Sequence, residues 1–447
     1  MKIKFILFIL IITVSSALFA QSDEDRFFYG SDTDTDLKVN LPDYSFSTKG
    51  IQYGAIVSPI YLYEDNDGGK LGSYIINTSV WAKTYLWSNS FFYIRGKDSY
   101  MGITTNDGSY SSVESDNILD LDLAYLSSST GSGTFNISLG RKYYSIGSGL
   151  VLNGRGDGGE ASLFGSTFSV KLLGMYSGLL KKDNNPYGLS DKDITDGAKR
   201  AFSGGTLTTA FYNQKLYLLG LAQFDMADQT TDAETKYDSQ YYGAGLEGVV
   251  FNDFSYFAEF VYETGTSYVT NTSAPNEESD IAAYAVNSGI SYYIPVALNP
   301  TLILQYAYGS GDKYRTSYST SNRSSGSGEE DTGFMYFGTF SGGYALKPAL
   351  GNIHIFRAGF SFTPISKMSI GAKYDYYMKD KKEAAINSGE AVLPEAFIGQ
   401  GVDVSLRWQM FYDLSMYVNY GLFLPGDAYD SSTGERTFVM AGVNLSI

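Results

Sequence analysis

Charged residues alternate with large apolar residues in several short segments of this chain. Arg95 and Lys97 lie out of phase with Phe92 and Ile94, so a β-strand would carry the two pairs on opposite faces. Where the charged faces of many strands surround one space, they can select solutes by the sign of their charge and by hydrogen bonding. The candidate solute-binding residues on these faces are Arg95, Lys97, Lys171, Glu259, Arg357, Lys373, Asp375, Asp403 and Arg407.

The same faces carry acids as well as bases, and this leaves a second role open for each charge. Further acids in the inward phase are Asp120, Asp122, Glu247 and Glu263. Opposite charges on neighbouring strands can solvate the lumen and pair with one another instead of binding a solute. Asp403 and Arg407, four residues apart on one face, place an acid beside a base in this way.

Residues suited to catalysis or to metal binding are scarce. His354 is the only histidine, and it shares the phase of Phe356 and Ala358, which places it on the predicted lipid side of its strand. A hydrolase with a serine-histidine site needs a histidine that faces the reaction. Cysteine is absent, which removes the thiolate ligands of a tight transition-metal site. We therefore predict no catalytic residue, no metal site, no cofactor and no enzymatic activity.

Two further motifs resemble functional sites but have simpler structural interpretations. Arg155-Gly156-Asp157 spells a tripeptide known from adhesion to host cells, but the predicted strand boundaries put it at a periplasmic turn that no host cell could reach. The acidic runs at 32–36 and 64–69 could bind calcium weakly through carboxylate oxygens. Their spacing fits no complete calcium loop, so solvated turns are the simpler interpretation.

The elements that must position the charges are clearest in residues 399–447. Three segments there, 402–410, 414–422 and 439–447, repeat apolar residues at every second position. Strands of about ten residues with one apolar and one polar face are typical of transmembrane β-barrels. The apolar side of such a strand meets lipid, and the polar side lines a watery lumen. The predicted fold is all-β, a single antiparallel transmembrane barrel.

The links between strand-like segments support about 18 strands. Outer-membrane barrels have short periplasmic turns, long outer loops and both termini in the periplasm. In this chain, short and long links alternate only if a weak strand lies at 148–156 and is followed by a strand at 161–178. The longest link, 311–351, has a Ser/Gly-rich half and an apolar part at 334–340. We expect the apolar part to fold into the lumen as a constriction or to extend the barrel wall.

The N-terminus and the composition agree with export. Residues 1–20 combine a short basic start with an apolar run and a small-residue cleavage site, which predicts a cleaved signal peptide. Residues 21–46 form an acidic, periplasmic lead, and the barrel is expected over 47–447. Loss of Lys2 and Lys4 with the signal would change the net charge from −16 to −18. This acidity argues against a nucleic acid as a partner.

Three motifs resemble the alginate export family of outer-membrane porins. They are Leu139-Gly140-Arg141-Lys142, the run from Tyr306 to Asp312, and the stretch from Gly399 to Phe423-Leu424-Pro425-Gly426. The resemblance implies a monomeric barrel of 18 strands whose basic lumen passes an anionic polysaccharide by diffusion. It also implies that Arg141 and Asp403 are lumen residues of the site. Arg141 is out of the lumen phase by simple alternation from Leu139, so a β-bulge is needed there.

The favoured function is a channel in the outer membrane of a diderm bacterium. It would pass polar or anionic solutes, including oligosaccharides or polysaccharides, and its other partners would be outer-membrane lipid and the barrel-assembly machinery. A closed or plugged barrel that acts as a surface interaction or adhesion protein is the alternative. A carrier of hydrophobic solutes is a third hypothesis, and it would require an apolar patch inside the barrel that the alternation does not plainly indicate.

Overall fold

A computed structural model describes residues 50–447, with gaps at 67–68, 107–110, 181–186, 190–192, 194–196, 228–234, 252, 271–275, 319–320, 322, 327 and 388. The predicted signal peptide and the acidic lead at 21–46 lie outside the described residues. No helix in the described part is long and apolar enough to cross a membrane.

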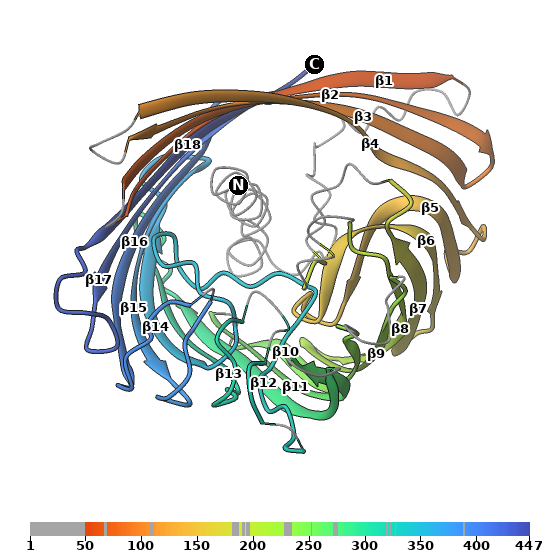
Figure 1. The fold of residues 1–447 in the computed structure, drawn as a ribbon. Coiled ribbons are helices and arrows are strands. Elements are labelled where there is room, and N and C mark those ends of the chain that lie inside the picture. Colours follow the sequence, from red (N-terminus) through yellow and green to blue (C-terminus); the bar gives the residue numbers. More distant parts are fainter. Residues whose placement is uncertain are drawn as a thin grey trace.

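The described chain forms one antiparallel sheet of 18 strands (Figure 1). Each strand pairs with its neighbours in sequence, and β1 also pairs with β18, so the sheet closes into a barrel. The prediction of a closed all-β barrel of about 18 strands is confirmed. The strands are β1 (Ile51–Asn66), β2 (Gly69–Trp87), β3 (Ser90–Asn106), β4 (Ser111–Ser129), β5 (Phe135–Ile146), β6 (Leu152–Phe164), β7 (Phe168–Ser177), β8 (Arg200–Phe211), β9 (Gln214–Asp225), β10 (Asp238–Val250), β11 (Phe254–Val269), β12 (Glu277–Tyr293), β13 (Thr301–Gly309), β14 (Ile353–Phe362), β15 (Met368–Lys379), β16 (Phe397–Gln409), β17 (Leu414–Pro425) and β18 (Arg436–Ser446).

The two faces of the wall follow the alternation in the sequence. In β16, Val402 and Val404 are exposed on the outside, whereas Asp403 between them is buried on the inside. The outer surface carries many exposed Leu, Phe, Val and Tyr side chains. An outer face of apolar side chains is typical of transmembrane barrels, in which this face meets lipid. The outer face is therefore the lipid-facing surface.

The region of β6 and β7 differs from the prediction. β6 runs from 152 to 164 and β7 from 168 to 177, so the predicted strands at 148–156 and 161–178 have wrong boundaries. The tripeptide at 155–157 consequently lies inside β6 and not at a periplasmic turn. Alternation failed as a guide because β6 is rich in glycine and its inner face packs on protein. A Cβ at Gly154 or Gly156 would lie 2.1 Å from Tyr187 or 2.7 Å from Met175, respectively.

The half of the β5–β6 hairpin next to its turn leaves the wall and folds into the lumen (Figure 1). β5 pairs with β4 only as far as Arg141, and β6 pairs with β7 only from Asp157 onward. Residues 142–156 of these strands pair with each other and with no other strand of the wall, and Leu152 forms an isolated bridge with Phe337. Tyr144 and Ile146 on one face of this part are fully buried and belong to a core that includes Phe202 and Leu221 of the wall. The hairpin thus covers the inner surface of β7–β9.

The long link between β13 and β14, residues 310–352, also lies in the lumen, and we call it the lumen segment. Its apolar part is buried at Phe334, Met335 and Phe337. The amide of Phe337 donates to the carbonyl of Val151 at the tip of the β5–β6 hairpin, at 3.1 Å. A Cβ at Gly338 would lie 1.9 Å from the carbonyl oxygen of Gly149, so this close approach requires glycine. Of the two expectations for 334–340, inward folding is confirmed.

Candidate solute path through the barrel

A group of alternating charges lines the inner face of β3, β4 and β6. Arg95 donates from Nε to Asp122 Oδ2 at 2.5 Å. Arg155 Nη1 lies 2.7 Å from Asp122 Oδ1 and 2.6 Å from Asp120 Oδ2. Lys97 lies beside the group and interacts electrostatically with both aspartates. Neighbouring strands therefore bring together four charges whose phase the sequence predicted and Arg155, which it did not.

Arg141 reaches the lumen through an irregularity at the preceding residue. Gly140 has φ +126°, a conformation that residues with a side chain rarely adopt. The irregularity changes the phase of β5, so Leu139 is exposed on the outside and Arg141 is buried on the inside. Arg141 binds Asp157 through Nε–Oδ1 (2.9 Å) and Nη2–Oδ2 (2.7 Å). The expected β-bulge is absent, because the register of β5 with β4 and with β6 runs on without a shift; the positive φ of Gly140 changes the phase in its place.

The ion pairs of Arg155 and Asp157 also settle how the adhesion-like tripeptide is placed. Both side chains point into the lumen, where Arg155 is bound to Asp120 and Asp122 of β4 and Asp157 is bound to Arg141 of β5. An adhesive peptide must present its arginine and aspartate to a receptor. The position inside the barrel is thus incompatible with an adhesive role, for a different reason from the periplasmic turn that the sequence suggested.

A second charged group lies on β14, β15 and β16. Arg357 donates from Nε to Asp375 Oδ1 at 2.6 Å and from Nη2 to Asp375 Oδ2 at 3.2 Å. Asp403 accepts the backbone amide of Tyr344 at 3.1 and 3.2 Å, which ties the lumen segment to the wall. Lys373 lies directly opposite Asp403 in the β15–β16 register. The structure therefore brings four of the predicted residues together here.

Glu259 and Lys171 hold the hairpin in place. Glu259 accepts hydrogen bonds from the Ser148 amide (2.7 Å), the Ser148 hydroxyl (2.5 Å) and the Tyr217 hydroxyl (2.6 Å). Lys171 donates to the carbonyl of Ser145 at 2.7 Å. Both residues are in the inward phase as predicted, but their observed partners belong to the protein. Arg407 is half-buried on β16, opposite Tyr417 of β17 and away from these anchors.

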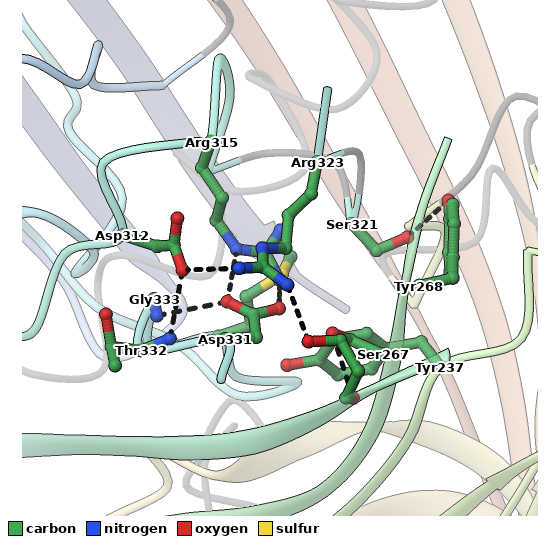
Figure 2. A network of polar contacts seen from close by, with 12 residues as sticks. Tyr237, Ser267, Tyr268, Asp312, Arg315, Ser321, Arg323, Asp331, Thr332 and Gly333 are labelled. Atoms are coloured by element: carbon green, nitrogen blue, oxygen red, sulfur yellow. Dashed lines mark hydrogen bonds and ion pairs between the residues drawn. The ribbon is translucent and has the colours of Figure 1, made fainter. Parts of the chain in front are cut away.

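Several buried polar residues that the sequence did not single out hold the lumen segment. Arg315 and Asp331 form an ion pair at 2.5 Å with neither side chain exposed. Arg323 lies beside them, 3.2 Å from Asp312 Oδ2 (Figure 2). Arg323 also donates to the Ser279 hydroxyl at 2.6 Å. Loop residues have no strand phase, so alternation could not have found them. Their only signal is the presence of two arginines in an otherwise Ser/Gly-rich link.

A buried glutamate on the wall holds the apolar part of the same segment. Glu263 of β11 accepts hydrogen bonds from Tyr237 (2.6 Å), Tyr241 (3.0 Å) and the amide of Met335 (2.9 Å). The sequence predicted the inward phase of Glu263 but not this partner. Together with the hairpin, the lumen segment covers the inner face of β7–β15, where most inward side chains are buried.

The opposite side of the barrel, β16 to β4, keeps partly exposed polar residues on its inner face. Ser405, Asn77, Ser79, Lys83 and Lys97 are half-buried there. Near the ends of these strands that adjoin the outer loops, a cluster of apolar residues contacts Tyr344 of the lumen segment. The cluster includes Ile60, Leu62, Ile75, Met101 and Met440. An apolar patch inside the barrel, which the sequence did not plainly indicate, is thus present. It is packed against protein.

The single histidine takes no part in either charged group. His354 lies in the phase of the exposed Phe356, as predicted, and its Nδ1 is 2.9 Å from the Tyr306 hydroxyl. Asp380 lies 3.8 Å from its Nε2. Among the described residues, no group of three or more His, Cys, Asp or Glu side chains could hold a metal ion.

Comparison with known families decides which class of barrel this is. The family model described as alginate export matches residues 200–440, more than half of the chain. The chain belongs to the alginate export family. This result confirms the resemblance to the family, although only the second and third motifs lie within the match, and with the closed 18-stranded sheet it makes the protein an outer-membrane β-barrel. No curated protein matches the sequence.

Solved structures share the fold of this alginate export family member at low sequence identity. Pseudomonas aeruginosa OccK7 (OpdD) has 10% identity and a TM-score of 0.55, with 89% of this chain and 98% of that chain covered. P. aeruginosa OccK2 (OpdF), in complex with glucuronate, has 13% identity, a TM-score of 0.53 and coverages of 89% and 98%. P. aeruginosa OpdK with vanillate has 11% identity, a TM-score of 0.54 and coverages of 89% and 99%.

Proposed function

We propose that this protein is a passive outer-membrane channel for polar or anionic solutes, including oligosaccharides or polysaccharides. The observation that carries the proposal is the pair of charged groups, around Arg95 and Arg357, on the inner face of a closed barrel. Charged residues on the wall of a pore select solutes by sign and by hydrogen bonding. Family membership supports transport. The glucuronate and vanillate complexes of barrels with this fold support small carboxylates as one class of solute.

The residues proposed to meet the solute are five basic residues of the barrel wall. Arg95, Lys97 and Arg141 lie on β3 and β5, and Lys373 and Arg407 lie on β15 and β16. Each charged group also contains acids, so the wall offers paired charges and not a uniform positive field. A solute carboxylate would compete with Asp122 or Asp157 for a guanidinium. This exchange allows binding that is favourable and still readily reversed, as conduction requires.

The wider assignments follow from the same proposal. The protein acts by diffusion and has no enzymatic activity, no cofactor and no metal. It works as a monomer, with outer-membrane lipid around its apolar face and the barrel-assembly machinery as its insertion partner.

Planar-bilayer recording of the refolded protein tests the proposal. We expect stepwise conductance in KCl and a reduction of the current when an anionic saccharide is added. Protein that inserts into the bilayer without giving conductance steps would exclude the channel.

One observation favours a second candidate, a plugged barrel that acts as a surface interaction protein. The lumen segment and the hairpin cover the inner face of half of the wall, and several buried ion pairs hold them there. Deleting residues 316–330 while keeping Arg315 and Asp331 discriminates between the two. Altered conductance with unchanged adhesion to cells or matrix supports the channel, and loss of adhesion without a change in conductance supports the second candidate.

A further inference from the structure

Five aromatic side chains form a continuous line on the inner face of β2, β3 and β4, and we call it the aromatic track. In spatial order, the track consists of Tyr85, Phe91, Tyr125, Tyr93 and Trp81. The successive ring centroids are 6.4, 6.0, 5.5 and 6.1 Å apart. Since the contacts join rings from three strands, the track exists only in the folded wall.

The track faces the lumen and not the lipid. Phe92 and Ile94, which alternate with Phe91 and Tyr93, are exposed on the outer face. Trp81 lies inside, over Gly54 of β1, where a Cβ would come within 2.8 Å of the indole ring. Aromatic girdles of membrane barrels stabilise the protein by lying at the lipid interface. A line of rings on the watery side gains nothing from lipid, so its presence needs another explanation.

The track connects the periplasmic end of the barrel with the charged group on β3. Tyr85 and Phe91 flank the short turn at 88–89 between β2 and β3. Trp81 at the other end lies opposite Arg95 in the register, and Arg95 binds Asp122. Phe91, Tyr93 and Tyr125 are half-buried, so part of each ring surface remains accessible from the lumen. A solute that follows this wall would pass from rings to charges.

A cation lies directly on the track. Lys83 Nζ is 4.2 Å from the centroid of the Phe91 ring and 5.0 Å from that of Tyr85. An ammonium beside a ring face can bind a carboxylate that comes to lie next to the same ring. The track therefore combines ring surfaces, phenol hydroxyls and a positive charge within one line.

We propose that the aromatic track binds the sugar rings of an acidic oligosaccharide during its passage, an inference that rests on the proposed channel function. One face of a pyranose ring presents C–H groups that stack on an aromatic ring, while its edge carries hydroxyls that bond to tyrosine hydroxyls. A single-ring acid would cover only one member of the track. A chain of sugars can occupy several members at once, with its carboxylates next to Lys83 and Arg95. Many weak contacts in series allow a chain to bind and still slide, as conduction requires.

Block of single-channel current by a linear oligosaccharide of uronic acids tests this proposal. We expect concentration-dependent block of the wild type, and we expect Phe91→Leu, Tyr93→Leu and Tyr125→Leu each to raise the apparent Kd about two- to tenfold, the range for the loss of one aromatic contact. The matched control is Tyr100→Leu, because Tyr100 lies on β3 but is exposed on the outer face. It should leave the apparent Kd unchanged. Heat-dependent migration of the folded barrel on gels verifies that each variant has folded.

Distinct outcomes separate this proposal from the channel function itself. Absence of any conductance would overturn the channel and the track together. Normal KCl conductance without block by the oligosaccharide, or block that is equal in the wild type and in all three track variants, would overturn only the track. Stronger and more track-dependent block by benzoate than by the oligosaccharide would show that the rings serve single aromatic acids and would overturn the sugar assignment.

Discussion

The ion pair of Arg315 with Asp331 is expected to keep the lumen segment inside the barrel. Neither side chain is exposed, and two contacts join them, Nε–Oδ1 at 3.1 Å and Nη2–Oδ2 at 2.5 Å. The backbone of Asp331 also pairs with β12, since its amide donates to Asp280 and its carbonyl accepts from Ala282. Asp331 therefore links the arginine of the lumen segment to the wall. Asp331→Asn keeps the size of this side chain and removes its charge.

The cost of this substitution follows from the burial of the pair. Removing one partner of a buried ion pair costs about 3–5 kcal/mol, because the other charge stays buried without compensation. Arg315 cannot escape by losing its proton. In the wild type, burial opposes its charge, but Asp331 outweighs this effect and raises the pKa of the guanidinium above its ordinary value. The variant loses this support, and the guanidinium still keeps its proton because arginine is not deprotonated in proteins. Since about 1.4 kcal/mol is tenfold in an equilibrium, a loss of about 3 kcal/mol shifts the balance between docked and released segment by roughly a hundredfold.

Single-channel recording and limited proteolysis measure this shift. For Asp331→Asn we expect a larger mean conductance, more rapid fluctuations of the current, and faster cleavage within residues 316–330. Glu329→Gln is the matched control, because Glu329 pairs with Lys313 on the exposed surface of the same segment. Exposed ion pairs contribute little, so this control should behave as the wild type. The double variant Arg315→Met with Asp331→Leu should restore docking, since apolar residues can replace a buried pair.

The reasoning would be refuted by Asp331→Asn protein whose conductance and protease resistance equal those of the wild type. That result would mean that the apolar contacts of Phe334 and Phe337 alone hold the segment. A double variant that is released as readily as the single one would refute the narrower claim that the unpaired charge drives release.

Three further predictions concern the wall and the hairpin. Gly140→Ala should destabilise the barrel by roughly 1–3 kcal/mol or more, because Gly140 has a positive φ and a carbonyl oxygen would lie 2.3 Å from the new Cβ. Gly96→Ala, whose nearest atom lies at 4.0 Å, should leave the stability unchanged, and thermal melting curves of the two variants measure the difference. Arg155→Gln should shift the reversal potential in a KCl gradient towards cation selectivity, while Lys70→Gln, at the exposed outer end of β2, should leave it unchanged. Glu259→Gln should weaken the docking of the hairpin tip by about 1.5–3 kcal/mol, which is the range for hydrogen bonds to a charged group. The conductance should rise as a result, and an unchanged conductance would show that the tip does not limit the current.

Much of the wall could be predicted because strand phase is a local property. In β16, the alternation of Val402, Asp403 and Val404 predicts which side chains meet lipid, and the structure confirms it. The outward phase of His354 was predicted in the same way. A one-residue shift would move every apolar side chain to the wrong face, so the pattern specifies the register strongly.

The prediction failed where neither face of a strand meets lipid. The half of the β5–β6 hairpin next to its turn packs one face on β7–β9 and presents the other to the lumen, so neither face meets lipid. Its glycines, among them Gly154 and Gly156, are selected by close contacts with side chains that lie far away in the sequence. No local pattern of polarity reports such contacts, and the strand boundaries at 148–156 were consequently misplaced.

The sequence by itself determined that this chain forms a closed barrel of about 18 strands, with charges inside and apolar residues outside, because period-two alternation is written residue by residue. Only the tertiary structure decided what each inward charge does. Glu259 and Asp403 anchor the hairpin and the lumen segment, Arg95 and Arg155 share two aspartates, and five aromatic rings from three strands align into a track. These roles depend on distances between residues that are remote in the sequence. Such distances arise only when the strands pair and the hairpin and the lumen segment fold inward.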